Sequence, residues 1–278
     1  MISVFGSSGF IGSRFIQKYQ STVISLDRET SSTKSDDVLY FISTVHNYSI
    51  FDDPYVDINT NLTKLIEVLE DYRKSGRTGV FNFVSSWFVY GKTSDLPAHE
   101  NSPCNPTGFY SITKHAAEKL LASYCDTFGL KYRILRLTNI IGPNDKKVSK
   151  KKNALQYMID LLKNNEEVKL YDGGSAIRDY MFVDDCCEAI MACINNAPTN
   201  SITNISNSEP VSIRDIIHYA KEKLNSTSKI TNIDTPEFHK IVQIENMYLD
   251  NSMLLGLGYR PKTTVYQAVD AILKVHDD

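Results

Sequence analysis

Tyr110 and Lys114 have the residue types and the spacing of an acid/base pair, at the two ends of Tyr110-Ser111-Ile112-Thr113-Lys114. On a helix, residues four apart share a face, so the phenol and the ammonium would lie side by side. A phenol with a pKa of about 10 is a poor base at neutral pH, but a neighbouring cation stabilises its phenolate. The pair could therefore exchange protons with a hydroxyl or ketone. An ordinary exposed helical pair would show the same pattern.

Gly6, Gly9 and Gly12 follow a strand-like segment and open a helical one. Glycines at this point allow a tight turn, and they let backbone N–H groups approach a pyrophosphate at the N-terminus of the helix. Asp27, 21 residues after Gly6, could accept both ribose hydroxyls of NAD and repel the 2′-phosphate of NADP. Arg28 keeps NADP as an alternative, because a guanidinium can bind a phosphate.

Ser85 and Ser86 end the apolar run Phe81-Asn82-Phe83-Val84. In a parallel sheet, ligands bind at the carboxyl ends of the strands. We therefore expect the two serine hydroxyls to lie at the ligand-binding edge of the sheet.

The overall composition favours small-molecule partners. The chain has 278 residues and a formal net charge of −3, without the basic excess of a nucleic-acid or anionic-membrane binder. No apolar stretch approaches the roughly 18 residues that span a bilayer. The chain opens directly on the strand-like Ile2-Ser3-Val4-Phe5 with no charged leader. We therefore expect a cytoplasmic protein.

The cysteines and histidines show neither disulfide nor metal-ligand spacing, so we expect reduced thiols and no metal. The cysteines are Cys104, Cys125, Cys186, Cys187 and Cys193.

Strand-like and helical segments alternate, which predicts βαβ units and a doubly wound parallel sheet of the α/β class. The predicted strands are 2–5, 22–26, 38–43, 79–85 and 132–138, and the predicted helices are 11–19, 59–74 and 110–128. A lysine-rich loop after Pro143 suggests a dinucleotide-binding domain at 1–143 and a smaller α/β substrate domain at 144–278, with some C-terminal segments returning to the first. Ser212, three residues before Asp215, predicts the N-cap of a later helix.

Five motifs in order resemble the extended short-chain dehydrogenase/reductase family, in particular its nucleotide-sugar epimerases, dehydratases and 4-ketoreductases. The motifs are Gly6 to Gly12, Ser85 to Gly91, Tyr110 to Lys114, Arg136 to Pro143 and Asp172 to Asp185. The resemblance implies a Rossmann sheet that binds NAD, a nucleotide-diphosphate sugar as substrate, and a homodimer formed through the helices at 59–74 and 110–128.

The resemblance also implies roles for individual residues. Tyr110 would be the acid/base, Ser86 would hydrogen-bond the reacting oxygen, and Lys114 would lower the Tyr110 pKa and bind the nicotinamide ribose. Asn139 and Arg178 would contact the substrate, although a structural ion pair of Arg178 with Asp179 or Asp184 is an alternative. The expected cofactor-binding residues are Gly6, Gly9, Phe10, Ile11, Gly12, Asp27, Arg28, Ser43, Tyr110 and Lys114.

The sequence departs from the family pattern at several points. The stretch 27–38 is too short for the usual extra helix and strand, and Ser43-Thr44 stands where Ala-Ala is common. No arginine near 240–250 matches a second phosphate ligand, for which lysines of the 146–152 loop could substitute, unless that loop is simply solvated.

Three functions stay open. Trp87-Phe88 replace the Asp-Glu pair of dehydratases, which disfavours dehydration. A C4 epimerase that retains NAD is favoured slightly, because Asp27 points to NAD. The alternatives are a 4-ketoreductase that consumes NAD(P)H and a non-catalytic NAD-binding protein.

Overall fold

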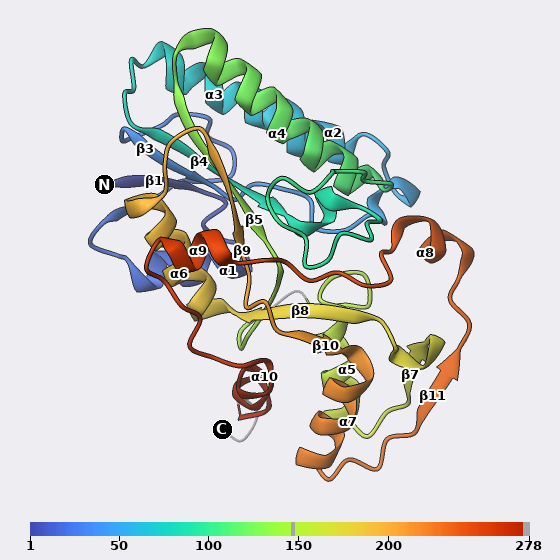
Figure 1. Ribbon diagram of the computed structural model, residues 1–278. Coiled ribbons are helices and arrows are strands. Elements are labelled where there is room, and N and C mark those ends of the chain that lie inside the picture. Colours follow the sequence, from blue (N-terminus) through green and yellow to red (C-terminus); the bar gives the residue numbers. More distant parts are fainter. Residues whose placement is uncertain (146–147, 275–278) are drawn as a thin grey trace.

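The computed structural model describes residues 1–145 and 148–274. Its centre is a wholly parallel six-stranded sheet in the order β2-β1-β3-β4-β5-β9 (Figure 1). The strands are β1 (Ile2–Phe5), β2 (Val23–Ser25), β3 (Asp37–Tyr40), β4 (Val80–Ser86), β5 (Lys131–Leu137) and β9 (Ser201–Ile205). The predicted doubly wound α/β fold is confirmed.

Helices bury both faces of this sheet. On one face α1 (Phe10–Lys18) and α6 (Val183–Asn196) share a core, and on the other α3 (Lys64–Lys74) and α4 (Phe109–Phe128) share a second core (Figure 1). With both faces covered, β3 to β5 are almost continuously buried, although β5 carries Arg133 and Arg136.

The edge of the sheet at β2 is trimmed, as the short 27–38 stretch predicts. After β2 the chain passes directly to β3, which pairs on the opposite side of β1. The predicted helix at 59–74 is in fact a π-helical turn η2 (Asn59–Thr63) followed by α3, and the short α2 (Val56–Ile58) precedes it. The widened turn contains Asn61, whose buried side chain bonds residues outside its own helix.

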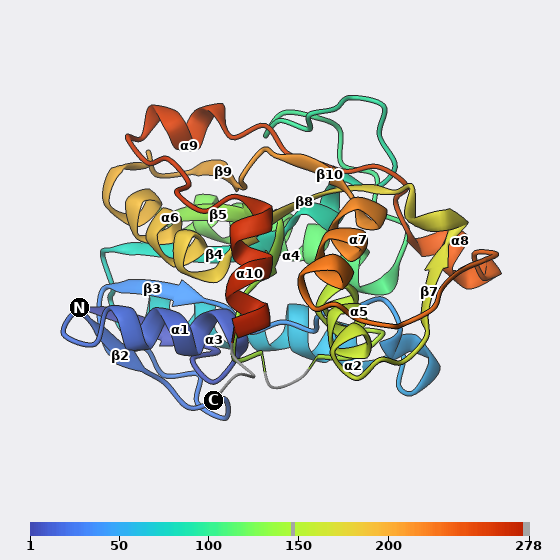
Figure 2. The ribbon, with the colours of Figure 1, turned by 90° about the horizontal axis from the view of Figure 1, so that it is seen from below.

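A second lobe lies at the carboxyl ends of the strands, and Figure 2 shows its helices beside the large sheet. One small sheet contains β6 (Asn139–Ile141), β8 (Ile177–Phe182) and β10 (Pro210–Ser212), and the other contains β7 (Val168–Tyr171) and β11 (Ile230–Ile233). The helices are α5 (Ala154–Lys163), α7 (Ile213–Lys223), α8 (Glu237–Val242) and α10 (Val265–Lys274), whereas α9 (Ser252–Gly256) packs against β9 in the large sheet. Short 3₁₀ turns are η1 (Ser49–Phe51), η3 (Trp87–Tyr90) and η4 (Asp172–Gly174).

The chain crosses between the lobes more than once. α6 packs beside α1, and β9 pairs with β5, so residues 183–205 belong to the large sheet although they follow the second lobe's first strands. The Ser212 hydroxyl accepts a hydrogen bond from Asp215 N at 3.0 Å, which confirms the predicted N-cap of α7.

All five cysteines are free thiols, and Cys104 alone among them is partly exposed. Within residues 1–145 and 148–274, no helix is long and apolar enough to cross a membrane.

A buried ion pair fixes α4 against β5. The Arg136 guanidinium donates to both carboxylate oxygens of Glu118, at 3.1 and 2.7 Å, and both side chains are almost fully buried. Arg136 also donates to the carbonyl of Glu100 at 3.2 Å. A bidentate geometry with an extra acceptor satisfies most of the guanidinium N–H groups, which a buried ion pair requires.

Replacing one partner of the Arg136–Glu118 ion pair tests how much the pair contributes to stability. Glu118→Gln leaves the Arg136 charge buried without a counter-charge, so we expect the free energy of unfolding to fall by about 3–5 kcal/mol. Urea denaturation followed by circular dichroism measures it. Glu237→Gln, which breaks the exposed pair with Lys240, is the matched control and should leave the transition unchanged. Equal effects of the two substitutions would contradict this role of the buried pair.

Candidate functional site

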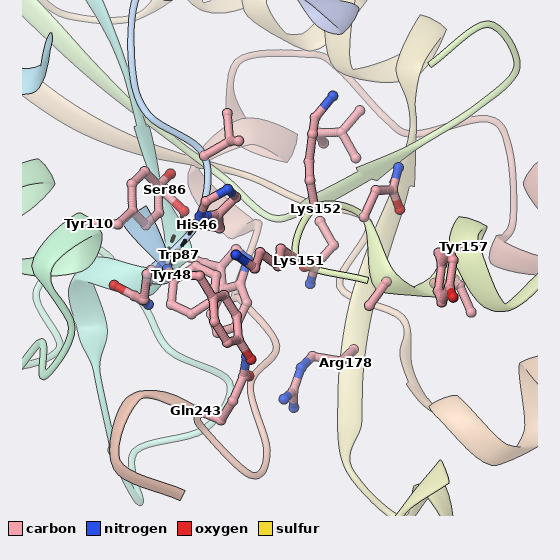
Figure 3. Close-up of a pocket in the computed structure, with 18 of the residues that line it drawn as sticks. His46, Tyr48, Ser86, Trp87, Tyr110, Lys151, Lys152, Tyr157, Arg178 and Gln243 are labelled. Carbon is pink, nitrogen blue, oxygen red and sulfur yellow. Dashed lines mark hydrogen bonds between the residues drawn. The ribbon is translucent and has the colours of Figure 1, made fainter. Parts of the chain in front are cut away.

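A cleft of about 2000 Å³ opens between the two lobes at the carboxyl ends of the strands. Its walls run from the glycine turn after β1, across the ends of β3 and β4, to η4 and α8. Figure 3 shows Tyr110, Ser86 and His46 together on one side of this cleft, with Arg178 and Tyr157 from the second lobe facing them across it. The fold thus brings Tyr110, Ser86 and Arg178 to one cleft.

The glycine turn forms a cradle for a dinucleotide. Gly6 has a φ of +77°, and a Cβ there would lie 2.9 Å from the Phe41 Cβ. A Cβ on Gly12 would lie 2.3 Å from the Gly6 carbonyl oxygen, so only glycine lets α1 start this close to the turn. Phe10 and Ile11 also line the cleft. The N-terminus of α1 can therefore receive a pyrophosphate, and the turn fits NAD or NADP.

The start of α4 is held from outside the helix. Gly108 is the N-cap, and Ser111 N donates to the side-chain oxygen of Asn47 at 3.3 Å. A Cβ on Gly108 would lie 2.1 Å from that oxygen, so the glycine makes room for Asn47. This contact positions the first turn of α4, which carries Tyr110.

Tyr110 is 8% exposed. Its burial raises the pKa of the phenol, and the Asp57 charge adds to this, while hydrogen bonding with the hydroxyls of Ser86 and Ser43 lowers it. Ser86, the last residue of β4, also accepts a hydrogen bond from Phe88 N at 3.3 Å. The phenol is therefore protonated at neutral pH.

Lys114 is buried one turn further along α4, 2% exposed. Its ammonium donates to the Val84 carbonyl at 2.7 Å and lies 4.1 Å from the centre of the Phe83 ring. Burial lowers the pKa of Lys114 to about 7, with Glu118 opposing. Desolvation thus favours the neutral form of both groups, and the role of Lys114 in lowering the Tyr110 pKa stays a prediction.

Asp27 and Arg28, the two residues expected near the adenosine ribose, differ in whether they line the cleft. Arg28 lines the cleft, whereas Asp27 is exposed and is not among the lining residues. Ser43 lines the cleft beyond the end of β3, and its hydroxyl donates to Asn61 Oδ1 at 3.1 Å.

Asn139 and Arg178 both reach the cleft from the second lobe. The Asn139 amide donates to the Asp179 carbonyl at 3.0 Å. The Arg178 guanidinium donates to the carbonyls of Ile177 and Glu245 at 2.8 and 2.6 Å and to that of Ile244. Much of its donor capacity is thus committed to backbone. In the described part of the chain it forms no ion pair with Asp179 or Asp184, and Asp184 pairs with Arg14 instead.

Several residues that line the cleft carry no recognisable signal in the sequence. His46 and Tyr48 lie in the loop after β3, and the Tyr48 hydroxyl is 2.6 Å from His239 Nδ1 on α8, which ties the two lobes together at the mouth of the cleft. Burial lowers the pKa of His239 to about 4. No local pattern in the sequence marks this contact, because the two residues are 191 positions apart.

The lysine-rich loop enters the cleft in part. Lys150, Lys151 and Lys152 line it, whereas Lys146 and Lys147 lie outside the described residues. Lys152 pairs with Asp145 at 2.7 Å, and Lys150 Nζ lies 5.6 Å from the centre of the Tyr171 ring. In the described ranges, no group of three or more His, Cys, Asp or Glu side chains is arranged to hold a metal ion.

Comparison with known proteins agrees with this geometry. The sequence profile of the NAD dependent epimerase/dehydratase family matches residues 2–206. A putative UDP-glucose 4-epimerase of Methanocaldococcus jannaschii is 24% identical, over 98% of this chain and 97% of its own.

Two solved structures share the fold over almost the whole chain. A UDP-glucose 4-epimerase of Thermotoga maritima with UDP-glucose superposes with a TM-score of 0.87 at 22% identity, covering 98% of this chain and 97% of its own. The RMD protein of Pseudomonas aeruginosa, complexed with NADPH, has a TM-score of 0.83 at 21% identity and the same coverage. With a profile match over most of its length and a glycine turn, Ser86 and Tyr110 around one cleft, the chain belongs to the NAD dependent epimerase/dehydratase family.

Proposed function

We propose that this protein is a nucleotide-sugar 4-epimerase that uses bound NAD. The observation that carries the proposal is the burial of Tyr110 and Ser86 together in the cleft that the dinucleotide cradle also lines. A sugar in this cleft would have its reacting carbon between a proton-exchanging phenol and the cofactor. Names of relatives support the same activity, since the similar proteins from M. jannaschii and T. maritima are described as UDP-glucose 4-epimerases.

The chain's own residues would manage the proton. Tyr110 would take the proton of the sugar C4 hydroxyl and return it to the C4 oxygen later. The Ser86 hydroxyl would hydrogen-bond that oxygen and stabilise the charge it develops. NAD, when bound, supplies the acceptor and donor of the C4 hydride. Because burial raises the Tyr110 pKa, the protonated phenol is ready to act as the acid, and turnover should rise with pH as the base form becomes available.

We assign the nucleotide diphosphate to the second-lobe side of the cleft. Basic side chains outnumber acidic ones among the lining residues described, which suits a substrate with two phosphates. Asn139 and Arg178 would contact the substrate there, and Lys150 has no carboxylate within ion-pair distance in the described part of the chain. An ammonium at that position can bind a phosphate oxygen.

A specific observation also favours a 4-ketoreductase. Arg28 rather than Asp27 lines the cleft, and a guanidinium there could bind the 2′-phosphate of NADPH. The RMD structure contains NADPH. Dehydration is disfavoured, because the Trp87 and Phe88 rings stack 3.9 Å apart where dehydratases carry an acidic pair. A non-catalytic NAD-binding protein would not require the buried Ser86 and Tyr110 pair.

The exposed face of α4 supports a proposal about how the protein assembles. We propose a homodimer through α3 and α4, because Ile112 and Leu120 on α4 are exposed apolar side chains, 46% and 41% accessible. Two copies could pack these helices as a four-helix contact. A cytoplasmic location stays a prediction.

Removal of the phenolic hydroxyl tests the role of Tyr110. Tyr110→Phe deletes the proton carrier and little packing, so we expect folding and NAD binding to persist while turnover falls at least about a hundredfold. Tyr132→Phe, on β5 and outside the cleft lining, is the matched control. Turnover of Tyr110→Phe close to that of the control would remove Tyr110 from the mechanism.

The fate of the cofactor tests the proposed function. We expect purified protein to release NAD when denatured, and to interconvert two C4 epimers in a panel of UDP-, dTDP-, GDP- and CDP-sugars without added cofactor. NMR of the sugars and absorbance of the released cofactor measure this. A protein that purifies empty, leaves every ordinary nucleotide sugar unchanged and oxidises NAD(P)H only with a 4-keto sugar would instead be the 4-ketoreductase.

A further inference from the structure

Two aromatic rings border the place where Tyr110 would meet a sugar. The Phe88 ring makes a T-shaped contact with the Tyr110 ring, with the ring centres 5.8 Å apart and the planes at 81°. Phe88 in turn stacks on Trp87 at 3.9 Å. Both residues belong to η3, the turn directly after Ser86, and both line the cleft. An aromatic surface therefore stands beside the proton-exchanging phenol.

This aromatic surface is firmly placed, because it is continuous with a hydrophobic core. Trp87 is 4% exposed and shares a core cluster with Ile244, and Phe88 and Leu96 pack against the same cluster. Leu96 and Ile244 also line the cleft. Phe88 N donates to the Ser86 hydroxyl at 3.3 Å, which fixes the start of the turn. The apolar wall of the cleft consists of Trp87, Phe88, Leu96 and Ile244.

The cation beside the apolar wall has partners within the protein. The Arg178 guanidinium lies 5.6 Å from the centre of the Trp87 ring. It donates to the backbone carbonyls of Ile177, Ile244 and Glu245, which occupies three of the five N–H groups of an arginine. The other two would serve the diphosphate of the substrate. A hydroxyl or carboxylate against the rings themselves would lose water without gaining a hydrogen bond from the wall, which is unfavourable.

The wall limits what the sugar can carry next to its reacting carbon. With the C4 oxygen at Tyr110 and Ser86, the neighbouring ring carbons are C3 and C5. In ordinary hexoses and their derivatives C3 carries a hydroxyl, whereas C5 carries a hydroxymethyl, a carboxylate or a methyl group. Of these substituents, the methyl group is the one that gains free energy by leaving water for an aromatic surface.

We propose that the apolar wall selects nucleotide sugars in which C6 is a methyl group, that is, nucleotide 6-deoxyhexoses. Phe88 is the specificity-determining residue, because it contacts Tyr110 directly. This inference deepens the proposed function and rests on it only in that C4 reacts at Tyr110. It applies to a 4-epimerase and to a 4-ketoreductase alike, since the wall acts on the C5 substituent and not on the hydride.

Matched nucleotide sugars test the wall whatever the base. Each set contains the glucose, the 6-deoxyglucose and the glucuronate of one diphosphate: UDP, dTDP, GDP or CDP. Isothermal titration calorimetry measures the affinity of the full-length protein with NAD present, and NMR measures kcat/KM for C4 epimerisation. Within the set that binds best, we expect the 6-deoxy member to be favoured over the other two by at least about tenfold in both quantities.

Variants of Phe88 assign the preference to the wall. Phe88→Gln offers an amide in place of the ring, so the preference for the 6-deoxy member should fall below about threefold. Phe88→Leu keeps an apolar surface and should keep the preference. Phe51→Gln is the matched control, because Phe51 lines the cleft but packs against Phe238 rather than Tyr110. It should leave the ratio within a set unchanged.

Equal affinity for the glucose and 6-deoxyglucose members, or tighter binding of the hydroxyl or carboxylate member, would overturn the proposal. So would an unchanged ratio in a Phe88→Gln protein whose circular dichroism shows that it is folded. If that variant does not fold, the ratio in the unaltered protein still decides. Preferential binding of the 6-deoxy member by a protein that forms no C4 epimer would support this inference and contradict the proposed function. Epimerisation of both members at equal kcat/KM would do the reverse.

Discussion

Desolvation of the first two turns of α4 is the constraint on which the rest of the site depends. Tyr110 and Lys114 are both buried, so the protein environment favours the neutral form of each group. Water no longer supplies their hydrogen bonds, and the fold must do so. The Val84 carbonyl on β4 meets this need for Lys114, and Ser86 at the end of the same strand lines the cleft together with Tyr110.

The position of α4 explains why these partners coincide. The helix is fixed at its start by Asn47, along its length by the Asn61 to Thr113 hydrogen bond, and toward its middle by the Glu118 to Arg136 ion pair. These contacts come from the loop after β3, from the π-helical turn and from β5. A chemical group that must be placed within a fraction of an ångström benefits from such support by rigid elements.

The sequence predicts best what depends on neighbouring residues. The glycine turn, the four-residue spacing of Tyr110 and Lys114, and the strand ending at Ser86 each follow from local rules, and the alternating pattern predicts the parallel sheet. The trimmed edge follows from the length of a single connection. These features survive because local propensity and the global fold agree.

The features that the sequence could not provide depend on distant partners. Arg178 is held by carbonyls some 66 residues later in the chain, and Tyr48 meets a histidine on α8. The π-helical turn forms where the Asn61 side chain bonds to Thr44 and Thr113 rather than to solvent. The raised pKa of Tyr110 likewise results from burial that only the assembled fold creates.

Transfer of a C4-deuterium label tests the central claim most directly. The protein would be incubated with an accepted nucleotide sugar carrying deuterium at C4, and the recovered epimer and the solvent would be analysed by NMR and mass spectrometry. If hydride leaves and returns at C4 while Tyr110 moves only the oxygen-bound proton, the epimer keeps its deuterium at C4 and the solvent gains none. Release of the label into water would mean that a proton is removed from carbon, and it would contradict this account.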